Sequence, residues 1–210
     1  RINGVIFMRS EEYLKKYSKL VKVLRILAQV VYWLSAVAIA ILLPLAIYLS
    51  VSKHWFISIG VLPGNLRLGY IDGVIRYNLA LAAGAVTPEH ANAILVQILF
   101  SIVVFTAVYG AISFFLSGVL KTIENGEPFQ RNNARRIFFI GLIFLGGSLF
   151  VGTAQASAAN VIIHAMRLTE ALTVNYSANS IMIVAGLLML ILSGVFRYGS
   201  YLQEEYDATL

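Results

Sequence analysis

Cysteine is absent from this chain of 210 residues, and charged side chains make up only 12% of it. The lack of thiols excludes disulfide bonds, thiolate metal sites and a cysteine nucleophile. Hydrophobic residues make up 59%, and the mean hydropathy is +0.80, outside the range of ordinary soluble domains. Because a soluble globule of this length would leave too much apolar surface in water, the composition predicts a membrane protein.

Four stretches of about 20 or more mostly apolar residues carry no formal charge. They are residues 26–51, 91–120, 137–163 and 177–196. At a rise of about 1.5 Å per residue, each is long enough to cross a hydrocarbon core of about 30 Å as a helix. The sequence therefore predicts an all-α integral membrane protein, a four-helix bundle that forms one membrane domain. Pro44 predicts a kink in the first span.

The distribution of positive charge predicts the orientation. Twelve of the 16 Lys and Arg residues fall in the N-terminal segment, the loop 121–136 and the tail 197–210, and four fall in the loops 52–90 and 164–176. Because Lys and Arg are enriched on the cytoplasmic side, both termini are expected in the cytoplasm. The net charge of +6 is thus explained by topology, and we expect no direct binding of nucleic acid.

Residues 11–24 predict an amphipathic helix on the inner membrane surface. Apolar residues such as Leu14, Val21 and Leu24 recur at helical spacing, and Lys and Glu occupy the opposite side. We expect an anchor attracted to anionic lipid, with a docking surface for a cytoplasmic partner as the alternative.

The outer loop 52–90 predicts a small β-hairpin. Asp72-Gly73 is a signal for a two-residue turn, and pairing outward from it matches Tyr70 with Ile75 and Leu68 with Tyr77. One face is then wholly apolar and is a candidate partner surface. This candidate outer face consists of Leu66, Leu68, Tyr70, Ile75, Tyr77 and Leu79.

Sequence features of catalysis and transport are scarce. The spans contain none of the charged side chains that mark proton relays or ion paths, so transport is disfavoured. There is no Gly-rich phosphate loop and no nucleophile elbow, which disfavours an enzyme and leaves no cofactor to expect. His54, His90 and His164 share the predicted outer side without a local metal motif, so single solvated histidines are expected rather than a metal site.

The two inner segments carry the most specific signals. Gly126 suits a left-handed position after the second span, and Pro128 prevents that helix from continuing. Pro128, Asn132 and Asn133 are alternative starts for the third helix. The tail is acidic, and we hypothesise that it packs on the arginines of the inner loop like a latch. The candidate inner-face residues are Gly126, Pro128, Phe129, Asn133, Arg135, Arg136, Glu204, Glu205 and Asp207, with Arg131 as a further partner of the tail.

These segments resemble a family of bacterial four-span membrane proteins known as domain of unknown function 2975. The likeness lies in Gly126-x-Pro128-Phe129 with Asn133-Ala134 and Arg136, and in Gly199-x-x-Leu202-Gln203-x-Glu205-x-Asp207-x-Thr209. The resemblance implies a bacterial cytoplasmic-membrane protein without an assigned reaction, often encoded beside a small helix-turn-helix regulator. Because the chain starts at Arg1 without Met, we expect further N-terminal residues.

The function expected from the sequence is that of a non-enzymatic membrane regulator or sensor. Its inner loop and tail would bind a cytoplasmic partner, and its outer hairpin would meet a ligand, a peptide or a state of the envelope. One alternative is an immunity protein or an accessory subunit of a membrane complex. Another is a small exporter or channel, which the uncharged spans disfavour.

Overall fold

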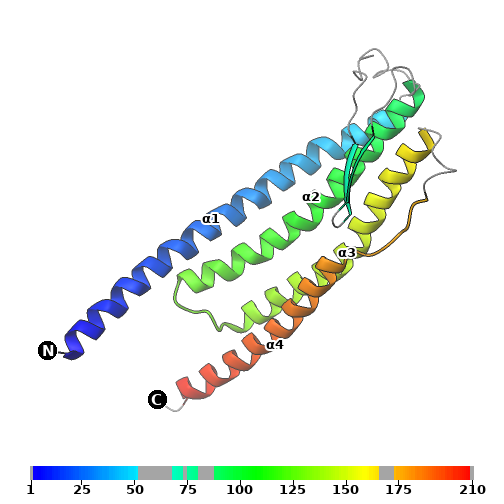
Figure 1. Ribbon diagram of the computed structural model, residues 1–210. Coiled ribbons are helices and arrows are strands. Elements are labelled where there is room, and N and C mark those ends of the chain that lie inside the picture. The colour runs from blue at the N-terminus through cyan, green and yellow to red at the C-terminus, as the bar shows by residue number, and fades with distance from the viewer. Residues whose placement is uncertain (1, 52–67, 73–74, 80–87, 166–172, 209–210) are drawn as a thin grey trace. The chain divides into compact units, whose positions relative to one another are not determined.

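Four long helices dominate the structure, a computed structural model (Figure 1). It describes residues 2–51, 68–72, 75–79, 88–165 and 173–208, and the side chains of 17–51, 92–164, 173–206 and 208. The helices are α1 (Ile2–Val51), α2 (Pro88–Glu124), α3 (Arg131–Ala165) and α4 (Ser180–Ala208). Each contains an 18-residue window with a mean hydropathy of 2.1 to 2.4, so each is long and apolar enough to cross a membrane. The predicted helical architecture with four candidate spans is confirmed.

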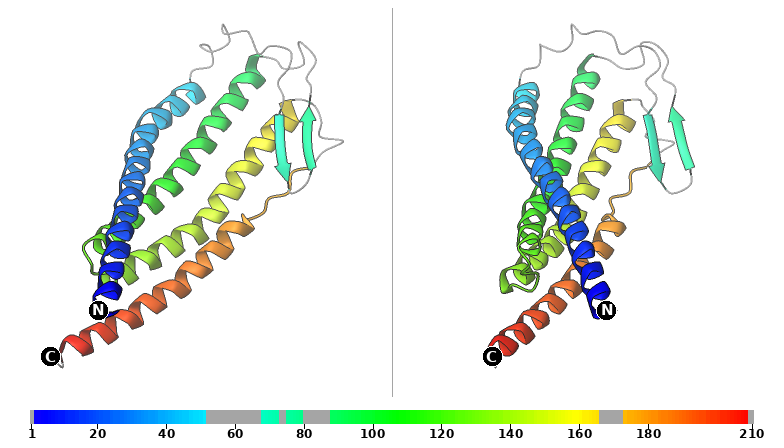
Figure 2. Two further views of the ribbon diagram at one scale, coloured as in Figure 1. Left: turned by 60° about the vertical axis from the view of Figure 1, so that its left-hand side comes forward. Right: turned by 90° about the vertical axis from the view of Figure 1, so that its left-hand side faces the viewer.

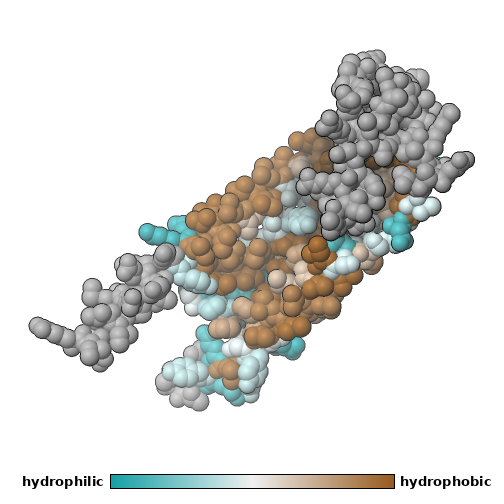
Figure 3. Space-filling view, in the orientation of Figure 1, coloured by the Kyte–Doolittle hydropathy of each residue, from teal (hydrophilic) through white to brown (hydrophobic). Residues whose placement is uncertain are grey.

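The helices expose large apolar side chains that water would not tolerate as a continuous surface. Trp33 on α1 is 65% exposed, Phe150 on α3 is 66% exposed and Ile191 on α4 is 66% exposed. In Figure 3 hydrophobic residues cover the visible face of the helices, and hydrophilic ones gather toward the C-terminal end of α4. Hydrocarbon is the solvent that suits such a surface.

The N-terminal amphipathic segment is not a separate element. Residues 11–24 belong to α1, which continues without interruption through residue 26 into the first apolar stretch and past Pro44 to Val51. No Gly or Pro stands near residue 25 to interrupt the backbone hydrogen bonds. The expected division into a surface helix and a span is therefore absent, and the kink at Pro44 stays a prediction.

The helix boundaries correct the predicted start of the third helix. α2 begins at Pro88, a residue that is favoured in the first turn of a helix. α3 begins at Arg131, so neither Pro128 nor an asparagine starts it. α4 begins after Asn179, whose Oδ1 accepts a hydrogen bond from the Met182 amide at 3.1 Å and so caps the helix.

The chain forms two compact units. The first consists of residues 1–39, 105–151 and 178–210, and the second of residues 40–104 and 152–177. In the first unit, α3 packs against α2 and α4 through positions without side chains. A Cβ on Gly147 would lie 2.8 Å from a methyl group of Val108 on α2, and one on Gly141 would lie 3.1 Å from the Gly186 carbonyl oxygen on α4. Small residues thus permit the close backbone approach that holds helices together in lipid.

In the second unit, two polar contacts join helices. Asn92 on α2 donates to the Leu49 carbonyl oxygen on α1 at 3.2 Å. Ser101 on α2 donates to the Ala154 carbonyl oxygen on α3 at 3.2 Å. Such interhelical hydrogen bonds are expected to contribute about 0.6 kcal/mol each.

Two short strands, β1 (Leu68–Asp72) and β2 (Ile75–Leu79), pair antiparallel in the second unit. Tyr70 pairs with Tyr77 and Leu68 with Leu79, so the predicted register is wrong by two residues. Asp72 pairs with Ile75, which makes 73 and 74 the intervening positions. Gly at the first of two loop positions favours one hairpin turn, and Asp-Gly favours another. The loop 73–74 therefore competes with the predicted loop 72–73. Because the shift is by an even number, Leu68, Tyr70, Ile75, Tyr77 and Leu79 still share a face.

Candidate functional site

The turn between α2 and α3, called here the inner turn (residues 125–130), is held by a Schellman motif. Gly126 has a φ of 84°, its amide donates to the Ile123 carbonyl oxygen at 3.0 Å, and the Glu127 amide donates to the Thr122 carbonyl oxygen at 3.0 Å. These two hydrogen bonds satisfy carbonyl groups that the end of α2 would otherwise leave unpaired. The prediction of a left-handed Gly126 is confirmed.

Asn133 is the polar centre of the inner turn. Its side chain is fully buried, and its amide nitrogen donates to Thr122 Oγ1 at 2.5 Å and to the Pro128 carbonyl oxygen at 2.9 Å. Asn133 Oδ1 accepts a hydrogen bond from Arg136 at 3.3 Å. A buried amide with all these partners fixes α3 against the end of α2, because losing any partner would leave an unsatisfied polar group.

Arg136 extends the same network across α2. Its Nη1 donates to the Gly118 carbonyl oxygen at 2.8 Å, and its side chain is half-buried. A Cβ on Gly118 would lie 2.9 Å from Arg136 Nε, so the absence of a side chain there makes room for the guanidinium. The arginine expected to meet the acidic tail is therefore engaged by α2 instead.

The inner turn also contacts α4. The rings of Phe129 and Phe196 lie 5.5 Å apart, and Phe129 covers Gly199 so closely that a Cβ there would lie 2.6 Å from its ring. Nearby, Ser193 donates to the Ala134 carbonyl oxygen at 2.8 Å in a buried position. These contacts join the start of α3 to the C-terminal half of α4.

The residues that carry the family resemblance thus separate into two groups. The first group, in and after the inner turn, makes the contacts that hold α2, α3 and α4 together. The second group lies at the end of α4, where Leu202, Gln203 and Glu205 are exposed. These three residues of the second group can therefore offer their side chains to another molecule.

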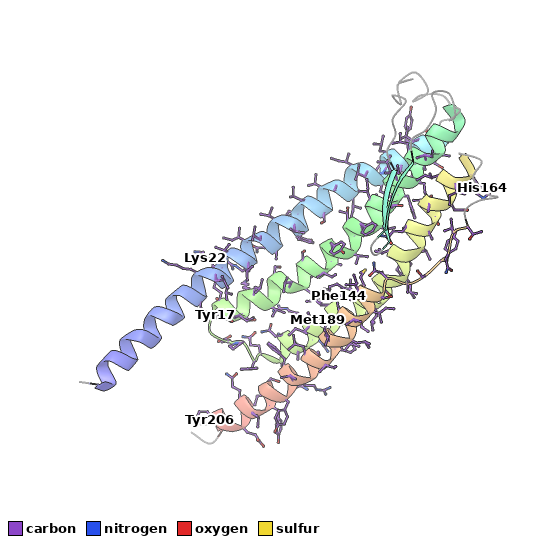
Figure 4. The ribbon with its side chains drawn as sticks, viewed as in Figure 1. Tyr17, Lys22, Phe144, His164, Met189 and Tyr206 are labelled. Atoms are coloured by element: carbon purple, nitrogen blue, oxygen red, sulfur yellow. The ribbon has the colours of Figure 1, made fainter. Side chains whose placement is uncertain are left out.

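The end of α4 forms an arm, defined here as residues 197–208. In the views of Figure 2 it extends beyond the inner turn of its own unit, and Tyr206 stands at its far end in Figure 4. Tyr198 is 65% exposed, Tyr201 55% and Leu202 46%. Tyr201 donates to Glu205 Oε1 at 2.6 Å along the helix. The arm therefore presents aromatic and acidic side chains outside the apolar part of the helix.

The predicted latch is not formed by the described side chains, which leave out that of Asp207. Neither Glu204 nor Glu205 forms an ion pair with the arginines of the inner loop, and both glutamates are exposed. The reason is geometric, because α4 stays helical to Ala208 and extends the glutamates past the inner turn. Arg131 and Arg135 are exposed.

An ion pair that sequence reasoning missed joins α1 and α2. Arg25 Nε and Glu124 Oε2 lie 2.9 Å apart, the two side chains are 24% and 19% exposed, and neither atom has a hydrogen-bond partner besides this pair. Both residues flank apolar spans on the predicted inner side. Two opposite charges at the same depth of neighbouring antiparallel spans could have predicted this ion pair.

Among the described residues, no group of three His, Asp or Glu side chains could hold a metal ion. His164 is exposed, while His54 and the side chain of His90 lie outside the described part. Of the candidate outer face, Leu66 lies outside the described residues.

The four long apolar helices are those of a multi-pass membrane protein. The family model described as protein of unknown function (DUF2975) matches residues 78–210, and the chain belongs to this family. Comparison with curated proteins and with solved structures gives no match. The match covers the inner turn and the arm, the two segments that carry the resemblance.

Proposed function

We propose that the chain is a non-enzymatic protein of the bacterial cytoplasmic membrane that binds a cytoplasmic protein through its arm and inner turn. Both termini lie in the cytoplasm in this proposal, and the protein acts as a regulator or sensor. The observation that carries it is the exposed arm, in which the family-like residues Leu202, Gln203 and Glu205 point their side chains away from the rest of the fold.

The length of the arm supports a partner in water rather than lipid alone. Tyrosines near Arg197 suit the interface of a membrane, where aromatic belts anchor helices. At about 1.5 Å per residue, however, Leu202 lies about 7.5 Å and Tyr206 about 13.5 Å beyond Arg197. The headgroup layer is only about 5–8 Å thick, so the end of the arm reaches past it.

The chemistry of the arm suggests the partner's surface. One positive charge at Arg197 stands against three negative charges at Glu204, Glu205 and Asp207, a balance that repels nucleic acid. Exposed apolar groups at Tyr198 and Leu202 occupy one side of the helix at i and i+4 spacing. A protein with an apolar groove bordered by basic residues fits such a helix. The family resemblance implies a small helix-turn-helix regulator as the first partner to examine.

The test places a photoreactive amino acid at position 202 or at position 188 of the full chain in its native membrane. Leu202 and Leu188 are both exposed leucines of α4, but Leu188 lies in the apolar stretch. We expect protein cross-links from position 202 and lipid cross-links from position 188. If position 202 captures only lipid, or if both positions capture the same proteins, the proposal is wrong.

A second measurement separates the alternatives. In co-purification of the chain without the photoreactive amino acid, Tyr198→Ala with Leu202→Ala should lose the partner identified by cross-linking, whereas Leu188→Ala should retain it. Release by changes to the hairpin residues Tyr70 and Tyr77 instead would favour an immunity protein or accessory subunit. Selective ion flux through liposomes containing the purified chain alone would favour a channel.

A further inference from the structure

A pocket of about 410 Å³ lies between the start of α3 and the C-terminal half of α4, within the first unit. Three arginines line it, two from α3 and one from α4, together with one phenylalanine and small or polar residues. The lining consists of Arg131, Asn132, Ala134, Arg135, Phe138, Ser193 and Arg197.

The positive charge of this pocket is not balanced within the described side chains. Arg131, Arg135 and Arg197 pair with none of the described carboxylates, in contrast to Arg25, which pairs with Glu124. The backbone amides in the first turn of α3 add partial positive charge at the helix N-terminus. This charge repels the arginines further unless an anion lies between them. Three guanidinium groups around one cavity therefore call for an anion, and phosphate oxygens match their paired N–H donors.

The depth of the pocket selects an amphiphilic anion. Arg197 is the first charged residue after the apolar stretch of α4, and Arg131 begins α3, so the arginines lie at the edge of the apolar part of both helices. Phe138, which also lines the pocket, is 43% exposed, and Leu142, one turn further along α3, is also 43% exposed. A phospholipid places its phosphate at this depth and its acyl chains beside such apolar side chains.

We propose that this pocket binds the headgroup phosphate of an anionic phospholipid of the inner leaflet. Arg131 and Arg135 on α3 and Arg197 on α4 hold the phosphate oxygens, and Phe138 contacts the upper part of an acyl chain. Ser193 contributes shape rather than a donor, because its hydroxyl already donates to Ala134. The pocket volume suits a lipid headgroup and the first carbons of its acyl chains. The rest of the acyl chains would lie on the exposed apolar surface of the helices.

The bound lipid would neutralise the arginines and bridge α3 to α4 at the inner end of the spans. This function is separate from the arm, since no residue of the pocket other than Arg197 belongs to it. A lipid site would remain if the arm bound no protein.

The first test needs no variant. The full chain, purified in a non-ionic detergent and stripped of lipid, is mixed with phosphatidylglycerol, with phosphatidylcholine or with inorganic phosphate. Native mass spectrometry and the thermal unfolding midpoint report binding. We expect retained adducts and a raised midpoint with phosphatidylglycerol only. Equal effects of both lipids, or the same stabilisation by millimolar phosphate, would overturn the proposal of an anionic lipid.

The second test locates the site. Each arginine near a membrane surface contributes about fivefold to anionic lipid affinity, so Arg131→Gln with Arg197→Gln should weaken phosphatidylglycerol binding about thirtyfold. Arg131→Lys with Arg197→Lys, which keeps the charge, should lose only part of this affinity. Lys121→Gln removes an exposed inner charge outside the pocket and should change binding little. A loss with Lys121→Gln as large as that with the double glutamine variant would place the effect in general surface charge and overturn the site.

Discussion

Arg136 donates from Nη1 to the carbonyl oxygen of Gly118, and its Nε lies 2.9 Å from where a Cβ on Gly118 would stand. The cation near the start of α3 therefore finds its acceptor in the backbone of α2. A lone arginine at this depth would be costly, so the glycine and the arginine act as one pair.

Gly118→Val should displace the guanidinium and remove this charge-assisted hydrogen bond, at a cost of about 1.5–3 kcal/mol in the free energy of unfolding. Reversible unfolding in mixed micelles measures it. Adding Arg136→Met to the valine variant should cost less than Arg136→Met alone, because the bond is already broken. Additive effects would show that the two residues do not interact.

Asn133→Ala should destabilise the chain by about 2–4 kcal/mol, because it empties a buried position and removes the hydrogen bonds to Thr122, the Pro128 carbonyl and Arg136. Asn132→Ala is the matched control, since its neighbouring amide is exposed. The same micelle unfolding assay applies. A similar loss of stability in both variants would contradict the central role given to Asn133.

Gly126→Ala and Gly146→Ala should change stability in opposite directions. Gly126 has a φ of 84°, so a side chain there costs about 1–2 kcal/mol. Gly146 lies inside α3 with open space where a Cβ would stand, so alanine there should stabilise the helix by about 1 kcal/mol. Thermal unfolding followed by circular dichroism compares the two, and a stabilised Gly126→Ala variant would contradict the Schellman turn.

The absence of native cysteine makes the proposed orientation simple to test. Asn125→Cys in the inner turn and Asn175→Cys before α4 both introduce a thiol at an exposed position. A membrane-impermeant maleimide should label position 175 in cells whose cytoplasmic membrane is intact, and position 125 only after that membrane is permeabilised. Labelling in the reverse order would place both termini outside the cytoplasm.

The helices were predictable because long apolar stretches can satisfy their backbone in lipid in only one way. The left-handed Gly126 was predictable for a similarly local reason, since few residues other than glycine adopt that conformation. The hairpin register was not, because Asp72-Gly73 and Gly73-Val74 are both acceptable two-residue loops and the choice lies in cross-strand packing.

The candidate site was only partly predictable. The sequence indicated that the inner loop and the tail matter, but it paired Arg136 with the acidic tail. Whether an arginine meets a carboxylate or a carbonyl depends on which helix lies opposite, and Gly118 gave no sign of that role. The pocket of Arg131, Arg135 and Arg197 was missed for the same reason, because its members come from two helices far apart in sequence.

The sequence by itself determined that lipid surrounds this protein and that four helices can cross a membrane. It also determined where the chain turns between the second and third helices. These properties follow from composition and from local backbone preferences. Tertiary structure alone decided which polar groups meet near the inner turn: Asn133 with Thr122, Arg136 with Gly118, and three arginines around one cavity. Contacts between helices depend on the depth of each helix in the membrane and on its rotation about its own axis, and the sequence of one helix does not fix either.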